Sequence, residues 1–539
     1  MAFRGISAIR PLPPAPGPPG PGPSAPVSPR WRDPAARAVR AAAALAGLAA
    51  IAGFAFVALS RLGYPFEVEW LESNSLVEVH RVLAGQPLYA APSAGYVPDG
   101  YPPLYFAVSA AVAAVSGVSY LPLRLVSLVS ALVCFGLLGR LVQRETSSAA
   151  AGTAAAGLFA GTYFVTRTWF DAGRVDSLFL ALSLGGLYAA WRMRGTRGAV
   201  AAGVLLAAAA LTKQTGFAEA VMVPGVLLGG PRRRLAWIAL ASAAAVTGVT
   251  TLILGAASHG WYVYYVFELM SQHSLSPGAA GVFAVSVLTA LGLALPAAVS
   301  GVRRVPPEVL AGCAAMIIEG FAALAHSGGG VNDVLPAYLA VALLAGLALG
   351  TPNGWRTAAA GGLVLAQTVL LLTSMHPSRA IPAGADRAAG TRVLAGMKAL
   401  GGTVADPTDP ALGPQAGLPA VAHADAAGDV LRAANRAAIA RYRASVASDI
   451  AGRRFSAVIS EHPGPPSGYP PVLLNRYYQE CPQPLLAGAP ASAFRPVDGV
   501  RFRPARLWLP RGRGSCAAAV RGFNTPGGSR TSPDGQARR

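Results

Sequence analysis

Charged residues are scarce in this sequence. Only 13% of its 539 residues are charged, whereas 53% are hydrophobic. Such a composition would be unusual for a soluble protein of any fold class, and residence in a bilayer explains it simply. The hydrophobic residues gather in about eleven stretches between residues 41 and 375, with the ionisable residues in the connections between them. The sequence therefore predicts a polytopic α-helical membrane protein.

Signals for nucleic-acid binding are absent, and cysteines are few. The formal net charge is +20, yet no basic helix or zinc motif accompanies it, so the excess of arginine indicates membrane topology and attraction to lipid phosphates. Cys134 and Cys313 fall within apolar stretches, where we expect them to pack. Cys481 and Cys516 lie in the polar C-terminal region, and we expect them to form a disulfide if that region is outside the cell.

The first forty residues lack an apolar run. Residues 1–40 are dominated by Pro, Gly, Ala and Ser, which bury little apolar surface and predict a disordered tail. A cleavable signal peptide would place its apolar core nearer to the start of the chain. Four arginines between positions 30 and 40 precede the first apolar stretch, so we expect the N-terminus in the cytoplasm.

Arginines between the apolar stretches indicate the topology. With the N-terminus inside, five successive arginine-bearing connections fall in the cytoplasm, as the positive-inside rule requires. The apolar segment 103–118 would reverse this order if it crossed the bilayer, at a cost of about 1 kcal/mol per misplaced basic residue. We therefore expect a re-entrant or juxtamembrane helix there, on the outer face. The predicted spans are 41–60, 121–142, 148–166, 177–192, 199–212, 216–229, 235–256, 279–299, 308–325, 334–350 and 357–375.

Eleven crossings place the C-terminal part of the chain outside the cytoplasm. The predicted parts are a membrane module at 41–375, an extracytoplasmic soluble domain at 376–521 and a disordered tail at 522–539. Residues 454–460 alternate as a strand does, and residues 426–447 have the pattern of a helix. The outer domain is therefore predicted to be a small α/β or α+β domain.

Polar residues that are unusual in a membrane protein converge on the predicted outer face. Charged groups at a bilayer boundary are costly and persist when they pair internally or serve a function. Carboxylates there can act as a general base, and basic side chains can neutralise a phosphate leaving group. This combination favours displacement of a lipid phosphate by an acceptor. The candidate residues are Glu67, Glu69, Glu72, Tyr101, Asp171, Arg174, Asp176 and Lys213.

Each candidate also has a plainer interpretation. The three glutamates follow a predicted span and would simply be solvated there; on a helix, Glu69 and Glu72 would share a face and Glu67 would not. Lys213 contradicts the positive-inside rule, so either an anionic ligand or an internal acid holds it, or it snorkels to the headgroups. No histidine pair has the spacing of metal ligands on one element, so we expect no cofactor, and a divalent cation has no support.

The order of the outer motifs resembles the GT-C superfamily of polyprenyl-phosphate-dependent glycosyltransferases, which includes protein O-mannosyltransferases and lipid A aminoarabinose transferases. The motifs are the acidic loop GYPFEVEWLES, then YPPLYF, FDAGRVDS and LTKQTG, followed by an outer domain. Bacterial family-39-like membrane enzymes are the most similar, and the resemblance covers roughly residues 40–375. It implies a bacterial plasma-membrane enzyme that transfers a hexose or pentose with inversion from a polyprenyl phosphate to a glycan, lipid or protein.

The resemblance also implies roles for individual residues. An acid of the first outer loop activates the acceptor in this family, and this role falls on Glu69 or Glu72. Basic residues bind the donor phosphate, which points to Arg174 or Lys213, while Asp171 and Asp176 shape the second outer loop. The family commonly has an Asp-Glu or Asp-x-Asp pair, and the acids here are spaced differently, so the sequence leaves the identity of the base open.

Two other classes of function remain open at this stage. A transporter or flippase of lipid-linked sugars also holds charges in a cavity, but it predicts two related halves, and no internal repeat is visible. A non-catalytic envelope-assembly protein would use its outer domain to bind partners.

Overall fold

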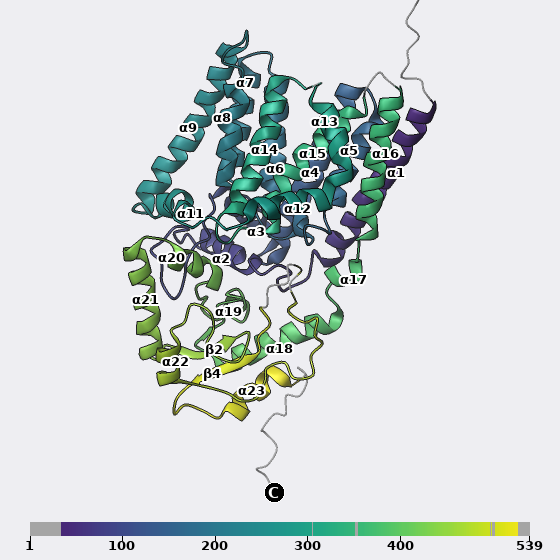
Figure 1. Cartoon of the computed structure of the whole chain (residues 1–539). Coiled ribbons are helices and arrows are strands. Elements are labelled where there is room, and N and C mark those ends of the chain that lie inside the picture. The colour runs from purple at the N-terminus through teal and green to yellow at the C-terminus, as the bar shows by residue number, and fades with distance from the viewer. Residues whose placement is uncertain (1–33, 304, 351–353, 496, 498–501, 526–539) are drawn as a thin grey trace, which may run out of the picture.

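A layer of helices carries a smaller mixed domain at one end (Figure 1). The computed structural model describes residues 34–303, 305–350, 354–495, 497 and 502–525. Most of the N-terminal tail and nearly all of the C-terminal tail predicted from the sequence lie outside these residues. The first helix begins at Pro34, so residues 34–40 of the predicted tail are helical. Proline is tolerated in the first turn of a helix, and the alanines that follow favour helix formation.

Helices occupy all eleven predicted spans, and the fold class is as predicted. The helical layer consists of α1 (Pro34–Arg61), α4 (Tyr120–Thr146), α5 (Ala149–Gly161), α6 (Asp176–Trp191), α7 (Thr196–Ala210), α8 (Phe217–Gly225), α9 (Arg233–Ala257), α12 (Ala279–Leu291) continued by η5 (Gly292–Ala294) and α13 (Leu295–Val302), α14 (Pro307–Ala325), α15 (Leu335–Ala348) and α16 (Gly354–Thr373).

Within the residues that the structure describes, seven helical segments are long and apolar enough to cross a bilayer. The helices α5, α6, α7 and α8 have 13, 16, 15 and 9 residues, fewer than a perpendicular crossing needs. These four lie within the same layer (Figure 1). Irregular backbone at membrane depth is tolerated where protein surrounds it, and the short helices end at the buried segments 162–175 and 211–216.

Two further helices lie across the end of the layer that faces the mixed domain. They are α2 (Glu72–Leu83) and α3 (Leu104–Ser116), and Figure 1 shows both between the spans and that domain. α3 has 13 residues, as many as α5, but it lies across the end of the layer and not within it, so the predicted re-entrant or juxtamembrane helix stays a prediction that this position favours. The start of α1 and the mixed domain lie at opposite ends of the layer, as an odd number of crossings requires.

The C-terminal domain contains a four-stranded sheet in the order β1-β2-β4-β3. The strands are β1 (Thr403–Ala405), β2 (Phe455–Ser460), β3 (Tyr478–Glu480) and β4 (Arg506–Pro510); β1 pairs with β2 in parallel, and β4 is antiparallel to both of its neighbours. The remaining helices are η2 (Trp169–Asp171), η3 (Gln214–Gly216), α10 (Trp261–Val263), η4 (Tyr264–Glu268), α11 (Leu269–Ser271), η6 (Val331–Val334), α17 (Pro377–Ala380), α18 (Gly384–Leu400), α19 (Leu412–Gln415), α20 (Ala424–Arg432), α21 (Arg436–Ala451), α22 (Pro471–Tyr477) and α23 (Cys516–Asn524).

Three details of this domain bear on the sequence predictions. Residues 455–460 form the predicted strand, and Cys481 and Cys516 form the predicted disulfide. The single helix predicted at 426–447 is wrong, because Asn435 caps a new helix by accepting a hydrogen bond from Ala438 N and so separates α20 from α21. The last helix, α23, extends to Asn524, three residues beyond the predicted end of the domain.

The outer loops pack into the C-terminal domain and hold it against the helical layer. Tyr64, Phe66 and Val68 of the first outer loop share a core with α18, β2 and β4. The aromatic segment 262–266 shares a second core with α20 and α21. Because both loops are anchored in this way, the chemistry-bearing residues beside them are held on packed elements.

The crossing of α1 and α5 gives a stability prediction. A Cβ on Gly157 would lie 2.0 Å from the Gly47 Cα, so Gly157→Val forces the two helices apart. We expect a loss of about 1–3 kcal/mol or more, seen as a lower thermal unfolding midpoint in detergent. Gly136→Val is the matched control, because a Cβ at Gly136 meets nothing within 4 Å. Equal midpoints for the two variants would contradict the close crossing.

Candidate functional site

A cavity of about 910 Å³ lies where the helical layer meets the C-terminal domain. We call it the first cavity. Its walls include the first outer loop, the segment before α6, the segment after α7, the loop before α15, and helix α20 of the C-terminal domain. Polar and aromatic residues that line it include Trp70, Asp99, Tyr101, Arg167, Trp169, Arg174, Lys213, His273, Asn332, Asp333, Asp425 and Asp429.

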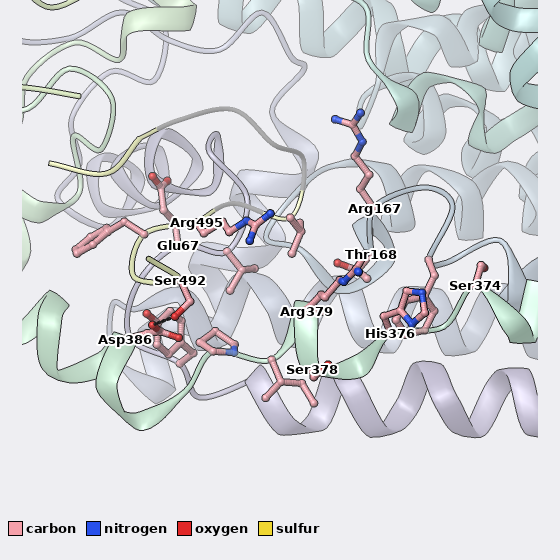
Figure 2. Close-up of a pocket in the computed structure, with 18 residues that line it drawn as sticks. Glu67, Arg167, Thr168, Ser374, His376, Ser378, Arg379, Asp386, Ser492 and Arg495 are labelled. Carbon is pink, nitrogen blue, oxygen red and sulfur yellow. Dashed lines mark hydrogen bonds between the residues drawn. The ribbon is translucent and has the colours of Figure 1, made fainter. Parts of the chain in front are cut away.

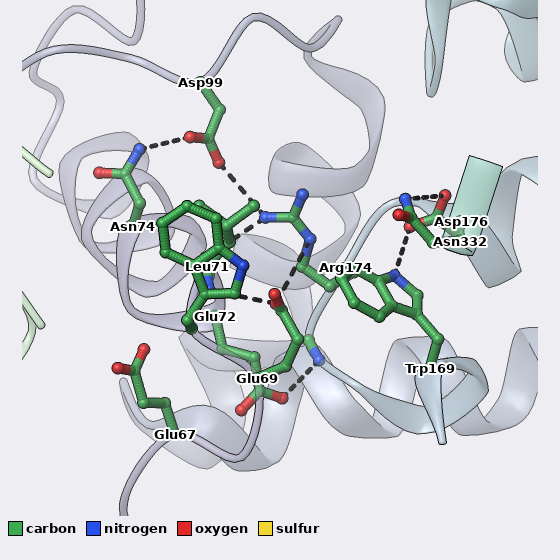
Figure 3. Close-up of polar contacts among 12 residues, drawn as sticks. Glu67, Glu69, Leu71, Glu72, Asn74, Asp99, Trp169, Arg174, Asp176 and Asn332 are labelled. Carbon is green, nitrogen blue, oxygen red and sulfur yellow. Dashed lines mark hydrogen bonds and ion pairs between the residues drawn. The ribbon is translucent and has the colours of Figure 1, made fainter. Parts of the chain in front are cut away.

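Arg174 is the central cation of the first cavity. Its Nε lies 3.7 Å from Glu69 Oε2, and its Nη1 lies 3.8 Å from Asp99 Oδ2. It donates a hydrogen bond of 3.2 Å to the Tyr101 hydroxyl and stands over that ring. Figure 3 shows the guanidinium between Asp99 and Glu69. Burial alone would lower the pKa of Arg174, but Tyr101 and the two carboxylates raise it above its ordinary value, so the group stays cationic.

Lys213 is held by two acids. Its Nζ lies 2.8 Å from Asp176 Oδ1 and 2.8 Å from Asp333 Oδ1. Asp176 also accepts hydrogen bonds from Trp169 Nε1 at 2.9 Å and Asn332 Nδ2 at 3.2 Å. Among the explanations that the sequence left open for Lys213, the structure therefore shows internal acid partners. The lysine still lines the cavity, next to Tyr101.

Asp99 adds a carboxylate to the eight candidate residues. Its Oδ1 accepts a hydrogen bond of 2.6 Å from Asn74 Nδ2, and its backbone N donates one to Glu78. The side chain is 6% exposed and lines the first cavity. Burial raises the pKa of Asp99, an effect that Arg174 and Asn74 oppose. A carboxyl with such a pKa is suited to exchanging a proton with a substrate.

Glu72 forms a buried clamp with Arg124 of α4. Arg124 donates to both of its oxygens, at 3.0 and 2.6 Å, and the backbone N atoms of Val68 and Gly173 donate to them at 2.8 and 2.6 Å. Burial would raise the pKa of Glu72, but Arg124 and these hydrogen bonds outweigh it and lower the pKa. Glu72 begins α2 and Glu69 precedes it, so the expected shared helical face is absent. The geometry gives Glu72 a structural role.

Asp171 is a second structural acid. Both of its oxygens accept hydrogen bonds from Arg61 at the end of α1, at 2.8 and 2.7 Å, and the Tyr163 hydroxyl donates another at 2.6 Å. Arg61 also donates to the Thr168 carbonyl and hydroxyl. The segment before α6 is thus fastened to the first span, and Asp171 lines neither of the two cavities described here.

Glu67 lines a different cavity, of about 490 Å³, which we call the second cavity (Figure 2). Its Oε2 accepts a hydrogen bond from Ser73 N, and burial together with Asp409 raises its pKa well above the ordinary value. Glu67 and Val68 line the second cavity, whereas Trp70 and Leu71 line the first. Glu69 lies between these pairs in the chain and lines neither cavity itself, and Arg167 lines both.

The structure brings together part of the predicted site. Tyr101, Arg174 and Lys213 line one cavity, Asp176 holds Lys213, and Glu69 contacts Arg174; Glu67, Glu72 and Asp171 are placed elsewhere. Arg124 was missed, although a lone arginine within an apolar span is a signal of an internal partner. Asp425 and Asp429 of α20 carry no signal in the sequence. Among the described residues, no three His, Cys, Asp or Glu side chains are grouped to hold a metal ion.

Comparisons with known proteins agree with this architecture. Residues 100–262 match the family described as dolichyl-phosphate-mannose-protein mannosyltransferase. No curated protein sequence matches the chain. The structure of apo ArnT from Cupriavidus metallidurans is similar, with a TM-score of 0.57 and 13% identity over 89% of this chain and 98% of that one.

Two further structures are similar to smaller parts of the chain. ArnT from the same organism bound to undecaprenyl phosphate gives a TM-score of 0.51 with 15% identity, over 70% of this chain and 85% of that one. Arabinosyltransferase EmbB from Mycobacterium smegmatis gives a TM-score of 0.35 with 16% identity, over 66% of this chain and 32% of that one, and carries no weight here. The ArnT matches show a shared fold.

The clamp between Arg124 and Glu72 gives a second prediction. Arg124→Met leaves Glu72 buried without its cation, and we expect the free energy of unfolding to fall by about 3–5 kcal/mol, measured by denaturation in detergent. Arg140→Met is the control, since Arg140 is exposed on the same helix and contacts Gln143. Adding Glu72→Gln removes the stranded charge and should recover part of the loss. If the double variant is no more stable than Arg124→Met, charge pairing does not explain the clamp.

Proposed function

We propose that this chain is a polyprenyl-phosphate-dependent membrane glycosyltransferase of the GT-C superfamily, and that it transfers a hexose or pentose with inversion from a polyprenyl phosphate to a glycan, lipid or protein acceptor. The observation that carries the proposal is the position of Glu69. Its carboxylate is buried and its Oε2 lies 3.7 Å from Nε of Arg174, the central cation of the first cavity. A base and a phosphate-binding cation are thus adjacent at this cavity.

The first cavity is the donor site in this proposal. Arg174, Lys213 and Tyr101 surround the phosphate of the carrier, and the apolar chain extends along the membrane-facing residues Leu275 and Val282. Undecaprenyl phosphate is bound to ArnT in one of the similar structures, which supports a carrier of this class. Arginine suits this role because its donors match phosphate oxygens in pairs.

The transfer is a single displacement at the anomeric carbon. Glu69 takes the proton from the acceptor group as it attacks that carbon, and the bond from the carbon to the phosphate oxygen breaks on the opposite face, which inverts the configuration. Polyprenyl phosphate leaves with the electron pair of that bond, so negative charge grows on the phosphate. Arg174 lies 3.7 and 3.8 Å from its two carboxylates, and these loose contacts allow it to move toward the growing charge.

The site is proposed to face the outside of a bacterial plasma membrane. The arginine-bearing connections lie at the end of the helical layer remote from the C-terminal domain, as the positive-inside rule predicts for a cytoplasmic face (Figure 1). The disulfide between Cys481 and Cys516 suits an oxidising compartment. The first cavity is at the outer end in this orientation, an arrangement that favours transfer at that face over transport across the membrane.

Substitution of Glu69 tests the base. Glu69→Gln should lower the transfer rate by about 10²–10⁴-fold, because the amide cannot take up the proton. Its unfolding midpoint should change little, since the amide oxygen can still accept the hydrogen bond from Leu71 N. The assay follows radiolabelled sugar leaving a polyprenyl phosphate donor. Glu268→Gln, at an exposed position, is the matched control and should remain active.

The variant Asp99→Asn tests the other carboxylate that could act as the base. If Glu69→Gln retains full transfer while Asp99→Asn loses it, Asp99 is the base and the assignment to Glu69 is wrong. If neither variant loses transfer, the proposed mechanism is wrong.

Labelling of introduced cysteines tests the orientation. Arg443→Cys lies on α21 and Arg194→Cys lies between α6 and α7, and both positions are exposed. In spheroplasts, an impermeant maleimide should label the first variant and should label the second only after permeabilisation. The native cysteines do not interfere, because Cys134 and Cys313 are buried and the other two are disulfide-bonded. The reverse pattern would overturn the proposed orientation.

A further inference from the structure

The second cavity lies at the boundary between the helical layer and the C-terminal domain, and it has no role in the proposed transfer. One wall is the segment after α16 together with α17, the other is formed by residues 492–495 and 497 of the C-terminal domain, and the first outer loop forms the back. The span α16 ends at Thr373, and Ser374, His376 and Ser378 follow it into the cavity. The cavity therefore opens at the level where a lipid headgroup meets the acyl region.

Two arginines approach this cavity from opposite walls. Figure 2 shows Arg379, from α17, and Arg495, from the C-terminal domain, directed toward its interior. Neither forms an ion pair with a carboxylate in the part of the chain that the structure describes. The side chain of Arg167 extends away from Arg379 in the same view, and this residue also lines the first cavity.

The acids of the second cavity do not balance these cations. Asp386 accepts hydrogen bonds from Ala383 N at 2.7 Å and from the Ser492 hydroxyl at 2.6 Å, forms no ion pair with either of these described arginines, and offers one charge against two. Burial and the nearby Asp409 raise the pKa of Glu67 well above its ordinary value, which favours the neutral acid. The cavity therefore keeps an excess of positive charge beside hydroxyl donors, which suits a phosphate group.

Apolar side chains make up the rest of the lining. Phe164, Ile381 and Phe494 lie alongside the arginines and serines. A free inorganic anion gains nothing from these groups, whereas a lipid gains contacts for its glycerol and upper acyl carbons. The volume of about 490 Å³ suits a headgroup. Basic pockets between spanning helices recognise lipid headgroups in this way.

We propose that the second cavity is a binding site for the phosphate headgroup of an anionic lipid, held between Arg379 and Arg495. This ligand is distinct from the carrier phosphate in the first cavity.

Lipid binding by the purified full chain in detergent tests this site, without any need for transfer activity. The probes are phosphatidic acid, diacylglycerol with the same acyl chains, and inorganic phosphate, each followed by native mass spectrometry. We expect phosphatidic acid to bind the unsubstituted chain and diacylglycerol to bind far more weakly. The double variant Arg379→Gln/Arg495→Gln should raise the dissociation constant for phosphatidic acid about tenfold to hundredfold, because two charge-assisted donor groups are lost.

The control is Arg441→Gln/Arg443→Gln, which removes the same charge from the exposed surface of α21 and should leave the affinity unchanged. Equal affinity in the two double variants, or equal binding of diacylglycerol and phosphatidic acid, would overturn the site. Inorganic phosphate that binds as tightly as the lipid would overturn its assignment to a lipid. Because binding is measured directly, the site can fail while the transferase proposal stands, and Glu69→Gln can fail while the site stands.

Discussion

The buried pairing of the outer loops with arginines from the spans is the constraint on which the rest of the structure depends. Arg124 of α4 fixes Glu72, and Arg61 of α1 fixes Asp171, so both loops that build the cavities are tied to the first membrane helices. A buried pair adds little net stability, because desolvation of the two charges offsets their attraction. The effect of each pair here is on position. Each carboxylate accepts hydrogen bonds from several donors at once, and this fixes the conformation of the backbone on either side of it.

The spans and the outer domain could be predicted because their signals are local. Apolar runs determine where helices lie, and the arginine-bearing connections determine their order across the membrane. The disulfide could be predicted for a similar reason, since only two cysteines lie in the polar C-terminal region. The break between α20 and α21 was missed, although asparagine is a favoured helix cap, and it is fixed by a distant partner: the side-chain oxygen of Gln272 accepts hydrogen bonds from the backbone N atoms of Ala434 and Asn435 between the two helices.

The site was only partly predictable, because its partners are far apart in the chain. Glu72 and Arg124 are separated by 52 positions, and Lys213 and Asp333 by 120, so no periodicity links them. Sequence spacing made Glu69 and Glu72 equal candidates for the base, but their surroundings differ. Glu72 accepts hydrogen bonds from four donors, whereas Glu69 contacts Arg174, the central cation of the first cavity. Residue type and position relative to the bilayer suggest which residues matter, and only packing distinguishes a clamp from a reactive group.

Charge is distributed differently in the two cavities, and this difference bears on what each can bind. In the first, Arg174 and Lys213 already have carboxylate neighbours, so an entering phosphate competes with Glu69, Asp99, Asp176 and Asp333 for the same cations. Such a site binds a singly charged phosphodiester weakly and a doubly charged leaving phosphate better, which is the selectivity that lowers a barrier. In the second cavity the two arginines of the proposed lipid site have no ion-pair partner among the described residues, so they are free to bind the phosphate of a ligand that does not react. The first cavity therefore suits a phosphate that becomes a leaving group, and the second suits a lipid headgroup that stays bound.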